Sequence, residues 1–222
     1  MDKKSIIKKI DKKFNSNNNL SGSKLRNKVA RNTYSFLPKD DNQLLELFDY
    51  LVSADDWKYF WLVTKWIKRK ELYNLEYMKY YEDWLYNHID SWGSCDVYCY
   101  RVLNPMLERY PELYKKVLEW AKSEKTYVRR AAPVSLLEST RSFKVNVSFS
   151  KVFEITEILK DDSEIHVQKG VGWLLKYAYL SYPEHVYEYL KNNVENLSRT
   201  IFRYALEKAP VADKEKLMNL DY

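Results

Sequence analysis

The scarcity of turn-forming residues constrains this chain more than any other feature. Only 4 glycines and 6 prolines occur among its 222 residues. Hairpin turns and glycine-rich phosphate loops depend on these residues, so they have little material from which to form. Leucine, lysine, glutamate and tyrosine are abundant instead, and this composition indicates helices.

Hydrophobic spacing predicts helices along almost the whole chain. The opening segment places Ile6, Ile7, Ile10 and Phe14 at helical spacing between lysines, which is typical of a short amphipathic helix. Pro105 is expected to kink or end one helix early, because a proline inside a helix removes a hydrogen bond. Further helices are predicted near 23–35, 41–52, 55–69, 73–88, 92–108, 111–122, 125–139, 148–160, 164–180, 183–192, 198–208 and 213–219, and a polar loop over 139–150.

A weak internal repeat indicates how the helices are arranged. VRRAAPVSLLE (128–138) aligns with VQKGVGWLLKY (167–177) at an offset of 39 residues. Helical hairpins that recur at this spacing are typical of HEAT-like solenoids, and the alternative is a nonrepetitive helical bundle. We therefore predict an all-α, HEAT-like helical-repeat solenoid with a concave basic face. It forms one domain over residues 1–222, with residues 1–20 as a peripheral N-terminal helix and linker.

Charge and cysteine usage limit the classes of function that the chain can have. Lysine plus arginine exceed aspartate plus glutamate by 37 to 31, and this excess favours a polyanionic partner. No apolar run approaches the length of a membrane span, so no membrane partner is expected. The scattered histidines and the pair Cys95 and Cys99 match no metal-ligand spacing. We expect a cytoplasmic, monomeric protein without a metal or cofactor.

Asp96 is the most unusual residue of the apolar helix stripes. It lies four residues after Trp92, on a stripe that continues through Cys99 and Leu103. An acid among apolar neighbours must find a partner, face a solvent-filled groove or raise its pKa. The structural alternative is an acid in the first turn of its helix, where the dipole favours it.

Three further groups carry basic residues. Arg129 and Arg130 precede two alanines, and each arginine could bind phosphate or pair with a carboxylate of a neighbouring repeat. A basic face that contains an aromatic ring is typical of nucleic-acid contact. Gly170 and Gly172 precede the indole of Trp173 on the same predicted helix. Glycine within a helix is costly, so their presence indicates that something approaches closely. The basic face comprises Lys169, Trp173 and Lys176, and a last basic pair is Arg199 with Arg203.

Three segments together carry a family resemblance. SWGSCDVYC (91–99), VRRAAPVSLL (128–137) and VQKGVGWLLKYAYLSYPEHVYEYL (167–190) occur in this order. The chain thereby resembles the AlkD-like DNA alkylation repair family, bacterial DNA glycosylases built from HEAT-like repeats. The resemblance implies a concave basic face that holds duplex DNA and removal of positively charged N3- or N7-alkylated purines.

The resemblance also implies roles for single residues. Asp96 stabilises the positive charge that develops on the sugar and orients a water molecule. Trp92 and Trp173 pack against the deoxyribose and the backbone of the lesion strand, and Arg130 grips a phosphate. Arg129, Lys169, Lys176, Arg199 and Arg203 are the other expected DNA-binding residues.

Two other functions fit the same sequence. One is a noncatalytic HEAT-like paralogue that binds bent or branched DNA, with steep salt dependence and no base release. The other is a protein-interaction scaffold whose concave face takes an acidic peptide.

Overall fold

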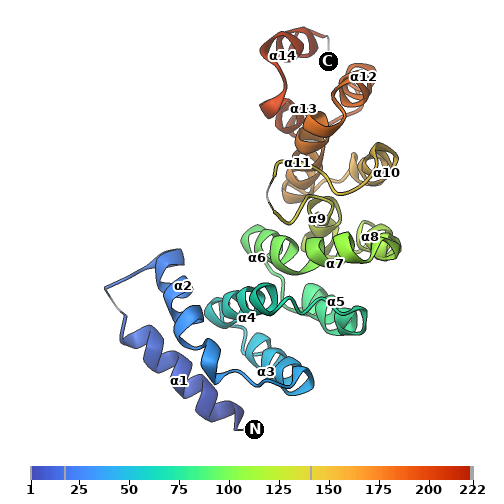
Figure 1. Cartoon of the computed structure of the whole chain (residues 1–222). Helices are drawn as coiled ribbons and strands as arrows, with labels where there is room; N and C mark the ends of the chain where they lie inside the picture. The colour runs from blue at the N-terminus through green and yellow to red at the C-terminus, as the bar shows by residue number, and fades with distance from the viewer. Residues whose placement is uncertain (1, 18, 141, 221–222) are drawn as a thin grey trace. The chain divides into compact units, whose positions relative to one another are not determined.

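The computed structural model is all-α and describes residues 2–17, 19–140 and 142–220. It divides into two compact units, residues 1–88 and 89–222. The prediction of an all-α fold is confirmed, and the two units are described separately below (Figure 1).

Every α-helix of the first unit contributes buried side chains to its core. Ile6 and Ile10 of the first helix are buried, so this segment packs as part of the unit. Trp66 is fully buried and donates from its indole Nε1 to the carbonyl oxygen of Ala30 at 3.0 Å. The helices are α1 (Lys3–Asn15), α2 (Gly22–Asn32), α3 (Asp41–Val52), α4 (Trp57–Lys70) and α5 (Met78–Asn87), with 3₁₀ turns at Tyr34–Phe36 and Leu75–Tyr77.

The second unit carries the sequence segments that suggested function. In Figure 1, α6, α9, α11 and α13 follow one another through this unit, and α6 contacts α9, α9 contacts α11 and α11 contacts α13. The helices are α6 (Trp92–Tyr98), α7 (Asn104–Arg109), α8 (Tyr114–Trp120), α9 (Thr126–Ser135), α10 (Phe149–Leu159), α11 (Ile165–Ser181), α12 (Pro183–Asn192), α13 (Arg199–Ala205) and α14 (Val211–Met218).

Proline positions explain two details of this unit. Pro111 and Pro183 each open a helical turn, where a missing N–H costs nothing. Pro105 does not end its helix as the sequence suggested it could. The backbone continues from α6 into α7 through a π-helical turn, Cys99–Leu103, which widens the helix just before the proline ring.

Side-chain hydrogen bonds reveal the repeat. Many of those that join separate helices connect residues 30 to 40 positions apart, as expected when successive helical hairpins stack. Tyr189 to Glu157 spans 32 positions and Tyr179 to Asp213 spans 34. These separations are shorter than the offset of 39 residues read from the sequence.

Within the predicted loop over 139–150, the described residues, 139–140 and 142–150, are largely irregular, apart from the last ones, which begin α10. An isolated antiparallel bridge pairs Leu137 with Val145 at its base. Within the described residues, no helix combines the length and the apolar character needed to cross a bilayer.

Candidate functional site

Asp96 and Trp92 are placed by a short, firmly capped helix. Ser91 precedes α6, and its side chain accepts from the backbone N–H of Ser94 while the Ser94 hydroxyl accepts from the N–H of Ser91. This reciprocal cap fixes the first turn. Trp92 stands in that turn with 56% of its surface exposed, which is unusual for so large an apolar side chain. Asp96 lies one turn further along the same helix.

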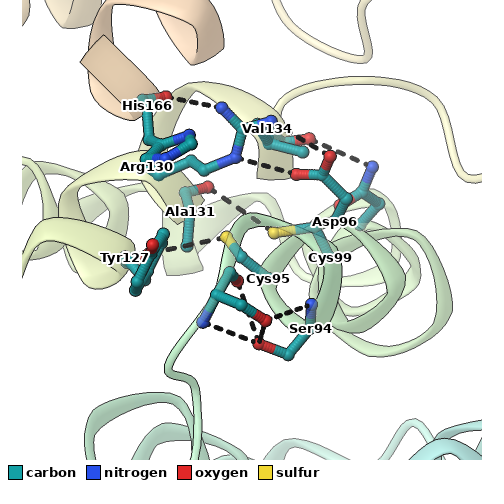
Figure 2. A network of polar contacts seen from close by, with 11 residues as sticks. Ser94, Cys95, Asp96, Cys99, Tyr127, Arg130, Ala131, Val134 and His166 are labelled. Atoms are coloured by element: carbon teal, nitrogen blue, oxygen red, sulfur yellow. Dashed lines mark hydrogen bonds and ion pairs between the residues drawn. The ribbon is translucent and has the colours of Figure 1, made fainter.

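Arg130 of α9 binds the carboxylate of Asp96 through two hydrogen bonds. Its Nε donates to Oδ1 at 2.9 Å and its Nη2 donates to Oδ2 at 3.0 Å (Figure 2). Its Nη1 donates to the carbonyl oxygen of His166 at the start of α11. The arginine side chain is 6% exposed and the aspartate side chain 17% exposed. Burial disfavours the guanidinium charge, but the hydrogen bonds and attraction to Asp96 outweigh it and raise the pKa of Arg130.

Two buried thiols lie on the same helical segment as Asp96. The Sγ of Cys95 donates to the carbonyl oxygen of Tyr127 at 3.4 Å, and that of Cys99 contacts the carbonyl oxygen of Ala131 at 3.9 Å (Figure 2). Both cysteines are free and fully buried, and burial raises the pKa of the Cys99 thiol well above its usual value. These buried side chains pack α6 closely against α9, as small core residues do.

Helix α11 supplies the opposite wall. His166, Lys169, Trp173 and Lys176 share one face, because their spacing of three and four residues follows the helical turn. The ring of Trp173 packs against Tyr100 at 5.8 Å and against Tyr177 at 6.0 Å, measured between ring centroids. Its indole orientation is therefore set by two aromatic neighbours.

These side chains meet in one open pocket of about 410 Å³. Its chemistry combines one carboxylate, two tryptophans and a predominance of cationic groups. Lys176 also binds Glu207 at 2.8 Å, whereas Lys169 has no ion-pair partner among the residues that the structure describes. The pocket is lined by Trp92, Asp96, Arg130, His166, Lys169, Trp173, Lys176 and Tyr204.

A second, more basic pocket of about 560 Å³ adjoins the first. The two pockets share Lys169 and Tyr204 in their walls. The second pocket also holds Arg199 and Arg203, so the sequence-predicted basic pair of α13 lies beside the α11 face. Its other lining residues are Thr200, Leu206, Glu207, Lys214 and Met218.

Arg129 is placed differently from the other predicted residues and does not line either pocket. Its Nε donates to Oδ2 of Asp162 at 2.6 Å, and its Nη1 donates to the carbonyl oxygens of Ser123 and Glu124, each at 2.9 Å. The guanidinium therefore joins α9 to the segment that precedes α11.

The sequence reasoning missed His166 and Tyr204. His166 stands three residues before Lys169 and seven before Trp173, so the helical period that identified those two residues could have included it. Tyr204 follows Arg203 and had no distinguishing signal, since tyrosine is abundant in this chain.

The glycines beside Trp173 serve helix packing. A Cβ atom at Gly172 would lie 2.5 Å from the Cβ of Tyr204, and one at Gly170 would lie 3.2 Å from the Cγ of Pro133. The close approach that the glycines indicated is therefore that of α13 and α9. Among the described residues, no group of three histidine, cysteine, aspartate or glutamate side chains is arranged to hold a metal ion.

Fold and site together define an all-α helical-repeat protein with a cationic pocket around one acid and two tryptophans. The family model of the DNA alkylation repair enzymes matches residues 9–209, and the chain belongs to that family. A solved structure, described as a predicted DNA alkylation repair enzyme from Enterococcus faecalis, has the same fold. It superposes with a TM-score of 0.70 and 16% sequence identity, over 86% of this chain and 87% of the other. None of the curated proteins matches this sequence.

Proposed function

We propose that this protein is a DNA glycosylase that hydrolyses the N-glycosidic bond of purines alkylated at N3 or N7 in duplex DNA. The observation that carries the proposal is that Asp96 lines a cationic pocket together with the exposed Trp92 and with Trp173. The basic surroundings suit a polyanion, and the carboxylate suits a centre that becomes positive.

The reaction needs one carboxylate and no general acid. An alkylated purine already carries a positive charge, so the electrons of the breaking bond neutralise the base and it leaves as a neutral molecule. The deoxyribose becomes an oxocarbenium ion, which Asp96 stabilises electrostatically. Water then adds at the anomeric carbon and loses a proton, and an abasic sugar remains. No metal or organic cofactor enters this balance.

Arg130 takes a different role in this proposal from the phosphate grip that the resemblance implied. Its Nε and Nη2 already donate to Asp96 and its Nη1 donates to the His166 carbonyl oxygen. A bidentate guanidinium fixes the direction of both carboxylate oxygens. We therefore propose Arg130 as a positioning residue for Asp96.

The remaining pocket residues bind the substrate. Trp92 and Trp173 pack against the deoxyribose and the backbone of the lesion strand, and the cations attract its phosphates. Arg129 is assigned no DNA contact, because its guanidinium binds Asp162 and two backbone carbonyl oxygens. The proposed phosphate ligands are Lys169, Lys176, Arg199 and Arg203.

The test is base release from randomly methylated duplex DNA, with the freed bases identified by mass spectrometry. We expect methylated purines from the parent protein and little release from Asp96→Asn. Asp162→Asn is the matched control, because Asp162 also pairs with an arginine of α9 but does not line the pocket. Release by Asp96→Asn at the parent rate would refute the catalytic role.

One observation favours a second function, noncatalytic binding of bent or branched DNA. Both oxygens of Asp96 accept from Arg130, which offsets much of the negative charge that catalysis requires. Binding that weakens steeply with salt, without release of any base, would support this alternative.

A further inference from the structure

The substrate-facing surface of α11 continues beyond the pocket. Lys169, Trp173 and Lys176 line the pocket, and the same helical face reaches Leu180 one turn later. Leu180 is 46% exposed. An apolar side chain at this place gives the cationic face an apolar end.

Phe143 lies at the same end of α11. Its ring meets the ring of Tyr177 edge to face at 5.4 Å, and Tyr177 in turn contacts Trp173 at 6.0 Å. Phe143 remains 52% exposed although it sits in this aromatic series. A continuous line of aromatic rings therefore leads from the pocket to an exposed ring.

The backbone holds Phe143 outward. Its φ of 63° lies in the left-handed region, which bulky residues rarely adopt. Two backbone hydrogen bonds close the loop around it. The N–H of Glu138 donates to the carbonyl oxygen of Lys144 at 3.0 Å, and the N–H of Asn146 donates to the carbonyl oxygen of Leu136 at 2.9 Å. Strained backbone that the fold holds in place is typical of ligand contacts.

One ammonium group lies over the exposed ring, and another lies over its aromatic neighbour. The Nζ of Lys208 lies 5.8 Å from the centroid of Phe143, and the Nζ of Lys176 lies 5.4 Å from that of Tyr177. Lys144, which follows Phe143, is exposed. An apolar tip between ammonium groups complements DNA, in which phosphates border the apolar faces of sugars and bases.

We propose that Phe143, supported by Leu180, is an apolar wedge that enters the minor groove beside the lesion. The proposal rests on the proposed function, because the alkylated nucleotide defines where the pocket sits on the duplex. Apolar side chains that insert between base steps from the minor groove unstack them and bend the DNA. Base pairs rise 3.4 Å each, so the two ring contacts correspond to a reach of about three base pairs.

The experiment uses the full chain and duplexes with 2-aminopurine at one, two or three positions from a lesion, on either side. Unstacking raises the fluorescence of this base. We expect a rise at one of these positions with the parent protein and none with Phe143→Ala. We also expect duplex affinity to fall about tenfold, the loss typical for one aromatic contact to DNA, and Leu180→Asn to weaken both effects.

Phe153→Ala is the matched control, because Phe153 is another exposed phenylalanine of the second unit, on α10 and 41% exposed. It should retain the fluorescence rise and the affinity. A fluorescence rise that survives Phe143→Ala, or none with the parent, overturns the wedge.

Base release is measured on separate samples, so the two proposals fail distinguishably. Base release without any fluorescence change would refute the wedge proposal and support the glycosylase proposal. A fluorescence rise that depends on Phe143, without base release, would refute the glycosylase proposal and support the wedge as a DNA contact.

Discussion

Removing the charge of Asp96 should slow base release more than removing the whole ion pair. In Asp96→Asn, the guanidinium of Arg130 stays buried next to residue 96 and loses its anionic partner. The growing positive charge on the sugar then faces an unneutralised cation. In the double variant Asp96→Asn, Arg130→Gln, both charges are absent.

Coulomb's law gives the approximate size of the effect of each charge on the transition state. A carboxylate about 4 Å from the oxocarbenium ion stabilises it by about 4 kcal/mol at an effective dielectric constant of about 20. The guanidinium donates to the carboxylate at 2.9 and 3.0 Å. In the proposed complex the sugar lies on the side of Asp96 away from Arg130, so the guanidinium, about 8 Å from the sugar, opposes the charge by about 2 kcal/mol. The single variant should therefore lose about 4 kcal/mol, or about a thousandfold in rate, and the double variant about thirtyfold.

Single-turnover base release from methylated duplex DNA measures these rates directly. The double variant should cleave about thirtyfold faster than Asp96→Asn. DNA affinity and circular dichroism, measured on the same preparations, establish that each variant is folded and binds substrate.

The corresponding control changes the other ion pair of α9. Asp162→Asn and the double variant Asp162→Asn, Arg129→Gln should both cleave within a few-fold of the parent, because neither residue lines the pocket. A folded double variant of the Asp96 pair that cleaves no faster than Asp96→Asn would show that Arg130 does not act through its charge.

The remaining predictions concern stability. Gly172→Ala should lower the free energy of unfolding by about 1–3 kcal/mol in urea denaturation, because its Cβ has no room against α13. Gly93→Ala, whose added Cβ would meet no atom within 4 Å beyond its own helix backbone and chain neighbours, should stabilise the protein by up to about 1 kcal/mol; equal effects would contradict the packing argument. Burial opposes the charge of Glu157, but hydrogen bonds from Lys160 and Tyr189 hold its pKa below the usual value. Its contribution is therefore complete above about pH 4.3 and lost as the pH falls through the lower folded pKa, so Glu157→Gln should cost up to about 1 kcal/mol at pH 7 and progressively less as the pH falls below that range.

Much of the fold could be predicted because helical periodicity is a local property. The helix containing Trp173 and the start of the helix containing Trp92 lie within a few residues of the predicted ranges. The π turn before Pro105 was not predictable, because either a kink or an early end also accommodates the proline ring. Its widened turn depends on how the surrounding side chains pack.

The site was only partly predictable, because the partner of a charged side chain belongs to tertiary structure. The spacing of Trp92 and Asp96 places both on one stripe, and the structure brings them to one pocket with Trp173. Nothing local in the sequence shows that Arg130 binds Asp96 or that Arg129 binds Asp162. These contacts join residues 34 and 33 positions apart.

The opposite pairings of two adjacent arginines follow from helix geometry. Neighbouring side chains on a helix point about 100° apart, so Arg129 and Arg130 cannot share a partner surface. Arg130 reaches back to Asp96 on α6 and also forward to the His166 carbonyl oxygen, while Arg129 reaches forward to Asp162. Helix α9 is thus joined to the hairpins on both sides of it. Because Arg130 contacts both Asp96 and the start of α11, its side chain helps to fix the distance between the two walls of the pocket.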